Sequence, residues 1–169
     1  MKSVLVTIAN KEYIDAAKQL FSSVYFNSGW KGDYLLITDN SIPERDLEWF
    51  EKKGIYIKKF KPIYNKTIGP FNKSPFMLFK LNLFKTFFKK WEKIVYLDSD
   101  IIVRGPLNEL LNVDKFGAVL RGLQQEKSNY LFGQFVLSFD SDKLNSICKK
   151  NTISIKELLI VEFLVLIVQ

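Results

Sequence analysis

The residues with the clearest capacity for chemistry are two aspartates, Asp98 and Asp100, one residue apart. An apolar run over residues 94–97 precedes them, and a second over residues 101–103 follows. In an extended chain residues i and i+2 point to the same side, so both carboxylates are expected to face one cation. Carboxylate oxygens suit Mn²⁺ or Mg²⁺, which neutralise two close acids and keep positions for water and phosphate. The pattern predicts a metal site, with a pair of solvated turn acids as the alternative.

Alternating strands and helices are expected to position this pair. β-Branched runs indicate buried strands, and apolar residues at spacings of three and four indicate helices with one buried face. Strands are predicted over residues 4–8, 33–38, 55–57, 94–97, 101–103, 117–120 and 135–139, and helices over 12–26, from a cap at Ser41 to Gly54, 75–88 and 106–111. Residues 60–74, rich in Pro, Gly and Asn, predict a loop over the edge of the sheet.

This order predicts an α/β fold with a mostly parallel central sheet flanked by helices. Such sheets bind ligands beyond the carboxyl ends of their strands, which here are residues 7–10, 38–40 and 98–100. The sequence has no G-x-G-x-x-G and no G-x-x-x-x-G-K-[ST]. The usual dinucleotide fingerprint and the P-loop are therefore excluded.

Composition narrows the classes of function further. With 47% hydrophobic and 25% charged residues, the chain is typical of a globular protein. The absence of His excludes Ser-His-Asp and Cys-His catalysis, and the single Cys148 excludes a disulfide within the chain. The net charge of +7 favours an anionic partner such as nucleic acid, an acidic membrane or a phosphorylated small molecule. The lysines are scattered and no Arg-rich tail exists, so we expect no nucleic-acid partner.

The two ends of the sequence bear on location. Residues 1–7 predict a strand rather than a signal peptide, and with one Cys a cytoplasmic location is expected. Residues 158–168 are nearly all apolar but too few to cross a bilayer, so no transmembrane segment is expected. An exposed apolar tail favours self-association or peripheral membrane contact.

The stretch from Trp91 to Leu110, with Asp98-Ser99-Asp100 at its centre, resembles the D-x-D region of glycosyltransferase family 8, the glycogenin and galactosyltransferase type. Residues 6–13, Val-Thr-Ile-Ala-Asn-Lys-Glu-Tyr, are similar to the strand and loop that hold the nucleotide in that family. Lys80 falls near the basic residue that reaches the sugar diphosphate. The resemblance covers about residues 1–140. It implies a GT-A fold, the Rossmann-like nucleotide-diphospho-sugar transferase fold, with a nucleotide-sugar-binding domain over 1–150 and an atypical apolar tail over 151–169.

The resemblance implies a hexosyltransferase that moves a sugar from a UDP-sugar donor to a sugar or glycan acceptor with retention. Mn²⁺ is the expected cofactor, with Mg²⁺ as the alternative. The implied roles are metal binding by Asp98 and Asp100, catalysis by Lys80 and Asp100, and nucleotide-sugar binding by Thr7, Ala9, Asn10, Tyr13, Lys80, Asp98 and Ser99. Tyr13 is expected to stack on the uracil.

Two departures from the family pattern support an alternative. Members complete the metal site with a C-terminal His, which this sequence lacks, and Gly133-Gln134-Phe135 stands where they have Asn-x-Gly. The sequence also ends where the acceptor-binding half of the family would continue. The alternative is a catalytically impaired or inactive nucleotide-sugar-binding relative or fragment. A sugar nucleotidyltransferase would need a Gly-rich loop after the first strand, and a nucleic-acid binder has no motif here.

Overall fold

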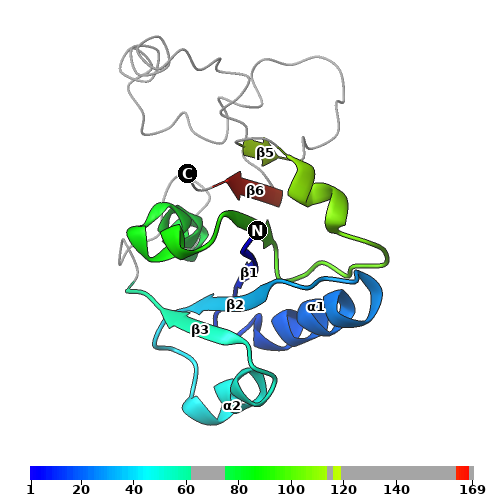
Figure 1. The fold of residues 1–169 in the computed structure, drawn as a ribbon. Coiled ribbons are helices and arrows are strands. Elements are labelled where there is room, and N and C mark those ends of the chain that lie inside the picture. Colours follow the sequence, from blue (N-terminus) through cyan, green and yellow to red (C-terminus); the bar gives the residue numbers. More distant parts are fainter. Residues whose placement is uncertain (62–74, 114–115, 119–162, 168–169) are drawn as a thin grey trace, which may run out of the picture.

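A computed structural model describes residues 1–61, 75–113, 116–118 and 163–167 of the chain (Figure 1). In chain order the elements are β1 (Ser3–Ile8), α1 (Ile14–Asn27), β2 (Asp33–Thr38), α2 (Glu44–Lys52), β3 (Tyr56–Lys59), the 3-10 helices η1 (Pro75–Phe84) and η2 (Thr86–Lys90), β4 (Lys93–Leu97), the 3-10 helix η3 (Asn108–Asn112), β5 (Phe116–Ala118) and β6 (Phe163–Ile167). Among these described residues, no helix combines the length and the apolar character needed to span a membrane.

The strands form one sheet in the order β3-β2-β1-β4-β6-β5. β1 pairs in parallel with β2 and β4, and β2 pairs in parallel with β3. β6 is antiparallel to both β4 and β5. The prediction of a mostly parallel α/β sheet is confirmed. Because β1, β2, β3 and β4 run the same way, their carboxyl ends meet at one edge, called the carboxyl edge below.

Both faces of the sheet are covered, because successive side chains of a strand point to opposite faces. One face packs Leu5, Leu36 and Val95 against α1 and α2. The other face packs strand residues such as Val6 and Tyr96 against η1 and η2. The residues that cover this face are Phe79 and Leu83 of η1, Phe88 of η2 and Trp91, which directly follows η2. Figure 1 shows α1 and α2 on one side of the β1–β2–β3 ladder and the two green helices on the other. All six residues of β1 are buried, as a strand covered on both faces requires.

The predicted strand over residues 101–103 is wrong. The backbone there pairs with side chains of α1 instead of a neighbouring strand. Asn27 donates its amide N–H to the Val103 carbonyl over 2.7 Å, and the Val103 N–H donates to the Ser23 hydroxyl over 2.9 Å. These bonds satisfy polar groups that a strand would have satisfied in a ladder.

The single helix predicted over residues 75–88 is also wrong, because two 3-10 helices occupy this stretch with a break at Lys85. Lys85 has an extended backbone, with φ −74° and ψ 152°. Its N–H donates to the Asn82 carbonyl, and the Phe88 N–H donates to the Lys85 carbonyl, each over 3.0 Å. An apolar pattern on most faces does not separate the two kinds of helix. Burial of the aromatic side chains against the sheet decides between them.

Three further points concern element ends. α2 has Pro43 as its N-cap residue, and the expected Ser41 cap is wrong because both the Ser41 hydroxyl and its N–H donate to the Asp39 carboxylate. β6 comes from the C-terminal apolar segment, for which the sequence predicted no strand. The loop predicted over residues 60–74 lies almost wholly outside the described residues, as do Gly133-Gln134-Phe135 and the strand predicted over 135–139.

Candidate functional site

The two aspartates of the D-x-D motif lie in a turn directly after β4. The Ile101 N–H donates to the Asp98 carbonyl over 3.2 Å and closes this turn. Ser99 is buried, Asp98 is half-buried and Asp100 is exposed. The extended geometry expected for the pair is therefore wrong, because the chain reverses between the two acids. The turn still presents both of them at the carboxyl edge.

Asp98 is held by a cation and by a phenol. The Lys80 ammonium of η1 lies 3.0 Å from Oδ1 of Asp98 and 3.3 Å from Oδ2. The Tyr96 hydroxyl donates a short hydrogen bond to the same Oδ1. The Lys80 ammonium also lies 5.0 Å from the centroid of the Tyr96 ring. The side chains of Lys80 and Asp98 are 33% and 26% exposed, so a ligand arriving from solvent can reach both charges.

Tyr96 is a residue that the sequence analysis missed. Burial raises the pKa of its phenol well above the ordinary value, and the negative charge of Asp98, the hydrogen bond to Asp98 and the charge of Asp100 raise this pKa further. The phenol therefore stays protonated and remains a donor to Asp98. Strand alternation could have found it, because Tyr96 and Asp98 are two residues apart and so share a face.

Thr7 and Ala9 occupy the carboxyl end of β1, and both are buried. The Thr7 hydroxyl donates to the Leu97 carbonyl of β4 over 2.8 Å, and the Ala9 N–H donates to the Ile37 carbonyl of β2 over 3.0 Å. The two residues therefore tie β1 to its neighbour on each side. They fix the position of the loop that follows β1 relative to the D-x-D turn.

The loop after β1 holds Asn10 and Tyr13. The Asn10 side-chain carbonyl accepts the Glu12 N–H over 3.0 Å and the Tyr13 N–H over 3.2 Å. The Asn10 side chain is thus already used to shape the entry into α1. The Tyr13 side chain is on the surface, with 48% of the residue exposed. The structure places this loop and the D-x-D turn at the same edge, because β1 and β4 are parallel neighbours.

Thr38 lies in the predicted ligand-binding region over residues 38–40, although no individual role was predicted for it. It ends β2 at the carboxyl edge and is fully buried. Its hydroxyl has no hydrogen-bond partner within the described residues. A buried hydroxyl without a partner is uncommon in proteins. Thr38 is therefore a polar group at this edge that the described residues leave unsatisfied.

The donor set at the D-x-D turn fits a hard divalent cation. Asp98 and Asp100 supply carboxylate oxygens, the ligands that Mg²⁺ and Mn²⁺ prefer. No group of three His, Cys, Asp or Glu side chains gathers in the part of the chain that the structure describes, at this turn or away from it. Such ions keep several waters and are also coordinated by substrate phosphates. Two carboxylates are therefore enough protein ligands for them.

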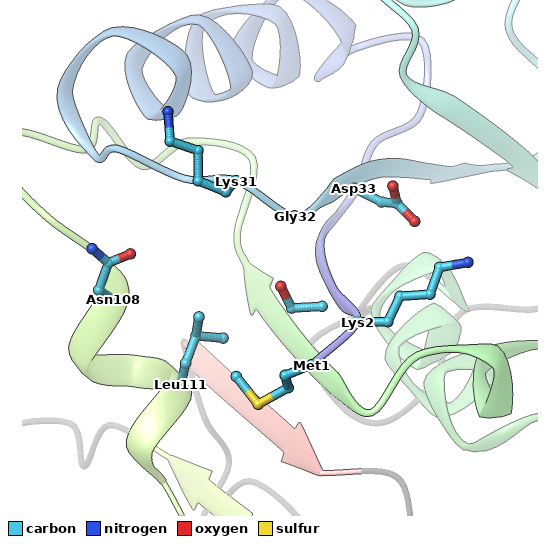
Figure 2. Close-up of a pocket in the computed structure, with 8 residues that line it drawn as sticks. Met1, Lys2, Lys31, Gly32, Asp33, Asn108 and Leu111 are labelled. Atoms are coloured by element: carbon cyan, nitrogen blue, oxygen red, sulfur yellow. The ribbon is translucent and has the colours of Figure 1, made fainter.

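A pocket of about 300 Å³ lies away from this site, at the opposite edge of the sheet. It is lined by Met1, Lys2, Ser3, Lys31, Gly32, Asp33, Asn108 and Leu111. Figure 2 shows Asn108 and Leu111 of η3 on one side and Lys2, with the segment that enters β2, on the other. Gly32 lies so close to Ser3 that a Cβ at this position would come within 2.6 Å of the Ser3 backbone. None of the predicted site residues lines this pocket.

Comparison with known proteins supports the family suggested by the motif. The sequence model of glycosyl transferase family 8 matches residues 4–157. The galactosyltransferase LgtC, solved with donor and acceptor sugar analogs, has a similar structure with a TM-score of 0.61 and 18% sequence identity. This match covers 77% of the present chain and 51% of LgtC. The bifunctional glycosyltransferase WbbM matches with a TM-score of 0.58 and 16% identity, over 98% of the chain and 31% of WbbM.

The chain thus spans about half the length of LgtC and about a third of WbbM. No curated protein sequence matches it significantly. At these identities the structural likeness shows the fold, and the family match covers most of the chain. The mostly parallel sheet with helices on both faces agrees with the family match and with the structural match to LgtC. The chain belongs to glycosyl transferase family 8 and has the GT-A fold.

Proposed function

We propose that this chain forms the donor-binding part of a glycosyltransferase that moves a hexose from a UDP-sugar to a sugar or glycan acceptor with retention. The observation that carries the proposal is the arrangement at the end of β4, where Lys80 and Tyr96 both contact Asp98. A cation and an anion that are both partly exposed at the carboxyl edge suit a ligand with a diphosphate and a metal. Family membership supports glycosyl transfer as the class of reaction.

The charged residues have distinct roles in this proposal. A divalent ion, Mn²⁺ or Mg²⁺, would be held by Asp98 and Asp100 and would neutralise the charge of the diphosphate. Lys80 places its ammonium beside Asp98, where it stabilises the negative charge that grows on the departing diphosphate. Tyr96 keeps Asp98 oriented through its hydroxyl. In this proposal the proton of the acceptor hydroxyl goes to the departing diphosphate, a route that needs no histidine base.

The loop after β1 binds the nucleoside in the same proposal. Tyr13, half-exposed beside the start of α1, stacks on the uracil. Asn10 contacts the nucleoside from the turn that its side chain stabilises. Thr7 and Ala9 line the base of this loop, and Ser99 lies in the D-x-D turn opposite. Each of these residues comes from the carboxyl end of β1 or β4.

A second candidate is a relative that binds the nucleotide sugar without transferring the sugar. It is favoured by the absence of His from the sequence. Among the described residues, only two carboxylates are available to hold the metal at this turn. Both candidates share the donor site, so a binding measurement alone does not separate them. Release of UDP from a UDP-sugar in the presence of glycan acceptors does.

Thermal unfolding with UDP, with and without Mn²⁺, tests the shared site. A ligand at about 100 times its Kd adds roughly 2.7 kcal/mol to the free energy of unfolding. For a chain of this size we expect Tm to rise by about 5–10 °C when UDP and Mn²⁺ are both present. A cooperatively folded sample whose Tm does not change with the two together would contradict both candidates. A Tm shift without UDP release from a panel of UDP-sugars would favour the second.

A further inference from the structure

The charges of this chain are distributed very unevenly along the sequence. The forty residues 52–91 contain eleven Lys, ten aromatic residues and no Asp, Glu or Arg. Since the whole chain has a net charge of +7, the residues outside this stretch together carry a net charge of −4. The net positive charge of the protein therefore comes from one region of the sequence, which includes β3, η1 and η2. A separation of this kind points to an anionic partner for that region.

The structure gathers part of this stretch into a single surface, called the Lys–aromatic face below. It consists of Tyr56, Lys58, Phe60, Lys85, Phe87 and Lys90, with the buried Trp91 beneath them. Tyr56 and Lys58 belong to β3, the outermost strand at its end of the sheet. Alternation puts Tyr56, Lys58 and Phe60 on the same face of that strand, where η2 packs against them.

Each of the three lysines in this face lies over aromatic rings. The Lys90 ammonium is 4.1 Å from the centroid of the Trp91 ring and 4.6 Å from that of Phe87. The Lys58 ammonium is 4.9 Å from the Phe87 centroid, and the Lys85 ammonium is 4.5 Å from the Phe60 centroid. Within the described ranges none of these three ammonium groups has a carboxylate partner. Their charge is held in place by the rings without being neutralised.

Exposed apolar side chains come just before this charge in the chain. Phe84 is 64% exposed and Leu81 is 53% exposed, and both belong to η1. Side chains three residues apart are eclipsed in a 3-10 helix, so Leu81 and Phe84 project from the same side of η1. Phe84 directly precedes Lys85. The lysines of the face, which have no carboxylate partner in the described part of the chain, are therefore accompanied by exposed apolar groups on the adjoining η1. Lysines and apolar groups together bind at the boundary between lipid headgroups and acyl chains.

We propose that the Lys–aromatic face docks the protein on a bilayer that contains anionic lipids. The lysines contact lipid phosphates, and Phe84 and Leu81 enter the headgroup boundary. A single-stranded nucleic acid fits less well, because base stacking needs free ring faces and here lysine ammonium groups cover them. The region also lacks Arg, the residue best suited to bidentate phosphate and base contacts. The docking surface is separate from the C-terminal apolar segment, which contributes β6 to the sheet.

Co-sedimentation of the full chain with vesicles tests this proposal. One vesicle contains phosphatidylcholine and phosphatidylglycerol in equal amounts, and the other contains phosphatidylcholine alone. The test variant is Lys85→Gln with Lys90→Gln. The matched control is Lys18→Gln with Lys31→Gln, which removes the same charge at α1 and just after it. Thermal unfolding shows whether each variant keeps a cooperative fold.

We expect binding to the anionic vesicles only, and weaker binding as salt is added. The Lys85/Lys90 variant is expected to lose about 30-fold in partition coefficient, at roughly fivefold for each lysine near the surface. The control is expected to lose no more than about threefold, through long-range charge alone. Equal losses in the two double variants would overturn the proposal. So would a folded wild-type chain that fails to sediment with anionic vesicles.

Phe84→Ser separates a lipid surface from other polyanions. We expect it to weaken binding to anionic vesicles on the order of tenfold, because an inserted ring is lost while the charge is unchanged. Binding to a single-stranded oligonucleotide is expected to be weak and the same in both proteins. Tight oligonucleotide binding together with vesicle binding that Phe84→Ser leaves unchanged would instead assign the face to nucleic acid and overturn the proposal.

Discussion

The ends of β1 and β4 lie side by side at the carboxyl edge, yet their polar groups are used differently. At the end of β1, the Thr7 hydroxyl donates to a backbone carbonyl of β4, and the Asn10 side chain accepts a backbone N–H at the entry into α1. At the end of β4, Asp98 pairs with Lys80, and Asp100 is exposed. At the first end the Thr7 hydroxyl and the Asn10 side-chain oxygen already bond backbone groups, so these two side chains act mainly as a scaffold. The second holds charges that an incoming diphosphate and metal can take over.

This contrast shows how a parallel sheet separates positioning from chemistry. Substitutions at the end of β1 are expected to act mainly on stability, because each removes a bond that the folded chain already makes. Substitutions at the end of β4 are expected to act mainly on ligand binding, because the charges there are partly exposed and worth little to the fold. The four predictions that follow test this division.

The largest effect is expected from Asp98→Asn. This change removes the carboxylate that contacts Lys80 and Tyr96, and we expect the whole Tm rise with UDP and Mn²⁺, about 5–10 °C, to disappear. Asp46→Asn on α2 is the matched control and should keep the full rise. A rise that persists undiminished in Asp98→Asn would place the ligand elsewhere and remove the contrast between the two ends.

Lys80→Gln is expected to have the next largest effect on binding. The Lys80 and Asp98 side chains are each about a quarter to a third exposed, so their ion pair contributes only about 0–1 kcal/mol to the free energy of unfolding. The affinity for UDP is expected to fall by about tenfold or more, since hydrogen bonds to charged groups contribute about 1.5–3 kcal/mol. Titration calorimetry with UDP and Mn²⁺ measures this loss. A variant that loses stability but keeps its affinity would assign Lys80 to the scaffold.

Tyr96→Phe is expected to change both stability and its dependence on pH. The pKa of Tyr96 is raised in the folded chain, so the folded protein keeps this proton when the unfolded chain loses it. Stability from this group is therefore complete below about pH 10 and is lost as the pH rises above that value. Tyr96→Phe should lower the free energy of unfolding by about 1 kcal/mol near neutral pH and reduce the alkaline loss. Denaturant unfolding at a series of pH values measures both quantities.

Tyr34→Phe is the matched control for that change. Burial also raises the pKa of Tyr34, so this variant should reduce the alkaline loss of stability as well. Tyr34 belongs to β2 and packs against Phe21 of α1, on the face of the sheet opposite to Tyr96, so its variant should leave the affinity for UDP unchanged. Tyr96→Phe should weaken that affinity a few-fold. Equal affinities in the two variants would show that the Tyr96 hydroxyl does not position Asp98.

Asn10→Ala is expected to give the smallest effect. It removes the acceptor for the Glu12 and Tyr13 N–H groups at the entry into α1 and should cost about 1 kcal/mol. For a chain of this size that corresponds to a Tm lower by about 2–4 °C without ligand. Asn40→Ala, in the loop after β2, is a control for the loss of an amide. A loss of UDP affinity far beyond the loss of stability would show that the Asn10 side chain itself, and not only the turn it stabilises, contacts the nucleoside.

Local patterns predicted most of the elements that build the carboxyl edge. The strand predicted over residues 33–38 has the same bounds as β2, and the predicted β1 and β4 each differ from the structure by one residue. These strands are buried on both faces, so their β-branched and aliphatic runs have a single interpretation. Residues 101–103 have the same apolar character and are not a strand, and Ser23 and Asn27 of α1 bond the N–H and carbonyl of Val103. Those bonds come from a helix about eighty positions away in the sequence.

The same distinction applies to the candidate site. The D-x-D motif and its apolar flanks indicated Asp98 and Asp100 without any knowledge of their neighbours. The position of Lys80 came from a resemblance, and Tyr96 was not predicted at all. Lys80, Tyr96 and Asp98 come together because η1 packs on the face of β4 from which Tyr96 projects. Packing between elements distant in sequence leaves no trace in local periodicity.

The sequence by itself determined the α/β order, the family and the acids that end β4, because these follow from short-range patterns and residue chemistry. The tertiary structure placed the two acids in a turn and Asp98 in contact with Lys80 and Tyr96. It also gathered three lysines, which have no carboxylate partner among the described residues, over aromatic rings in and next to β3 and η2. It also decided that β6 pairs with β4 in the sheet. Each of these outcomes depends on which distant groups satisfy one another's hydrogen bonds and charges, and only the folded chain brings those groups together.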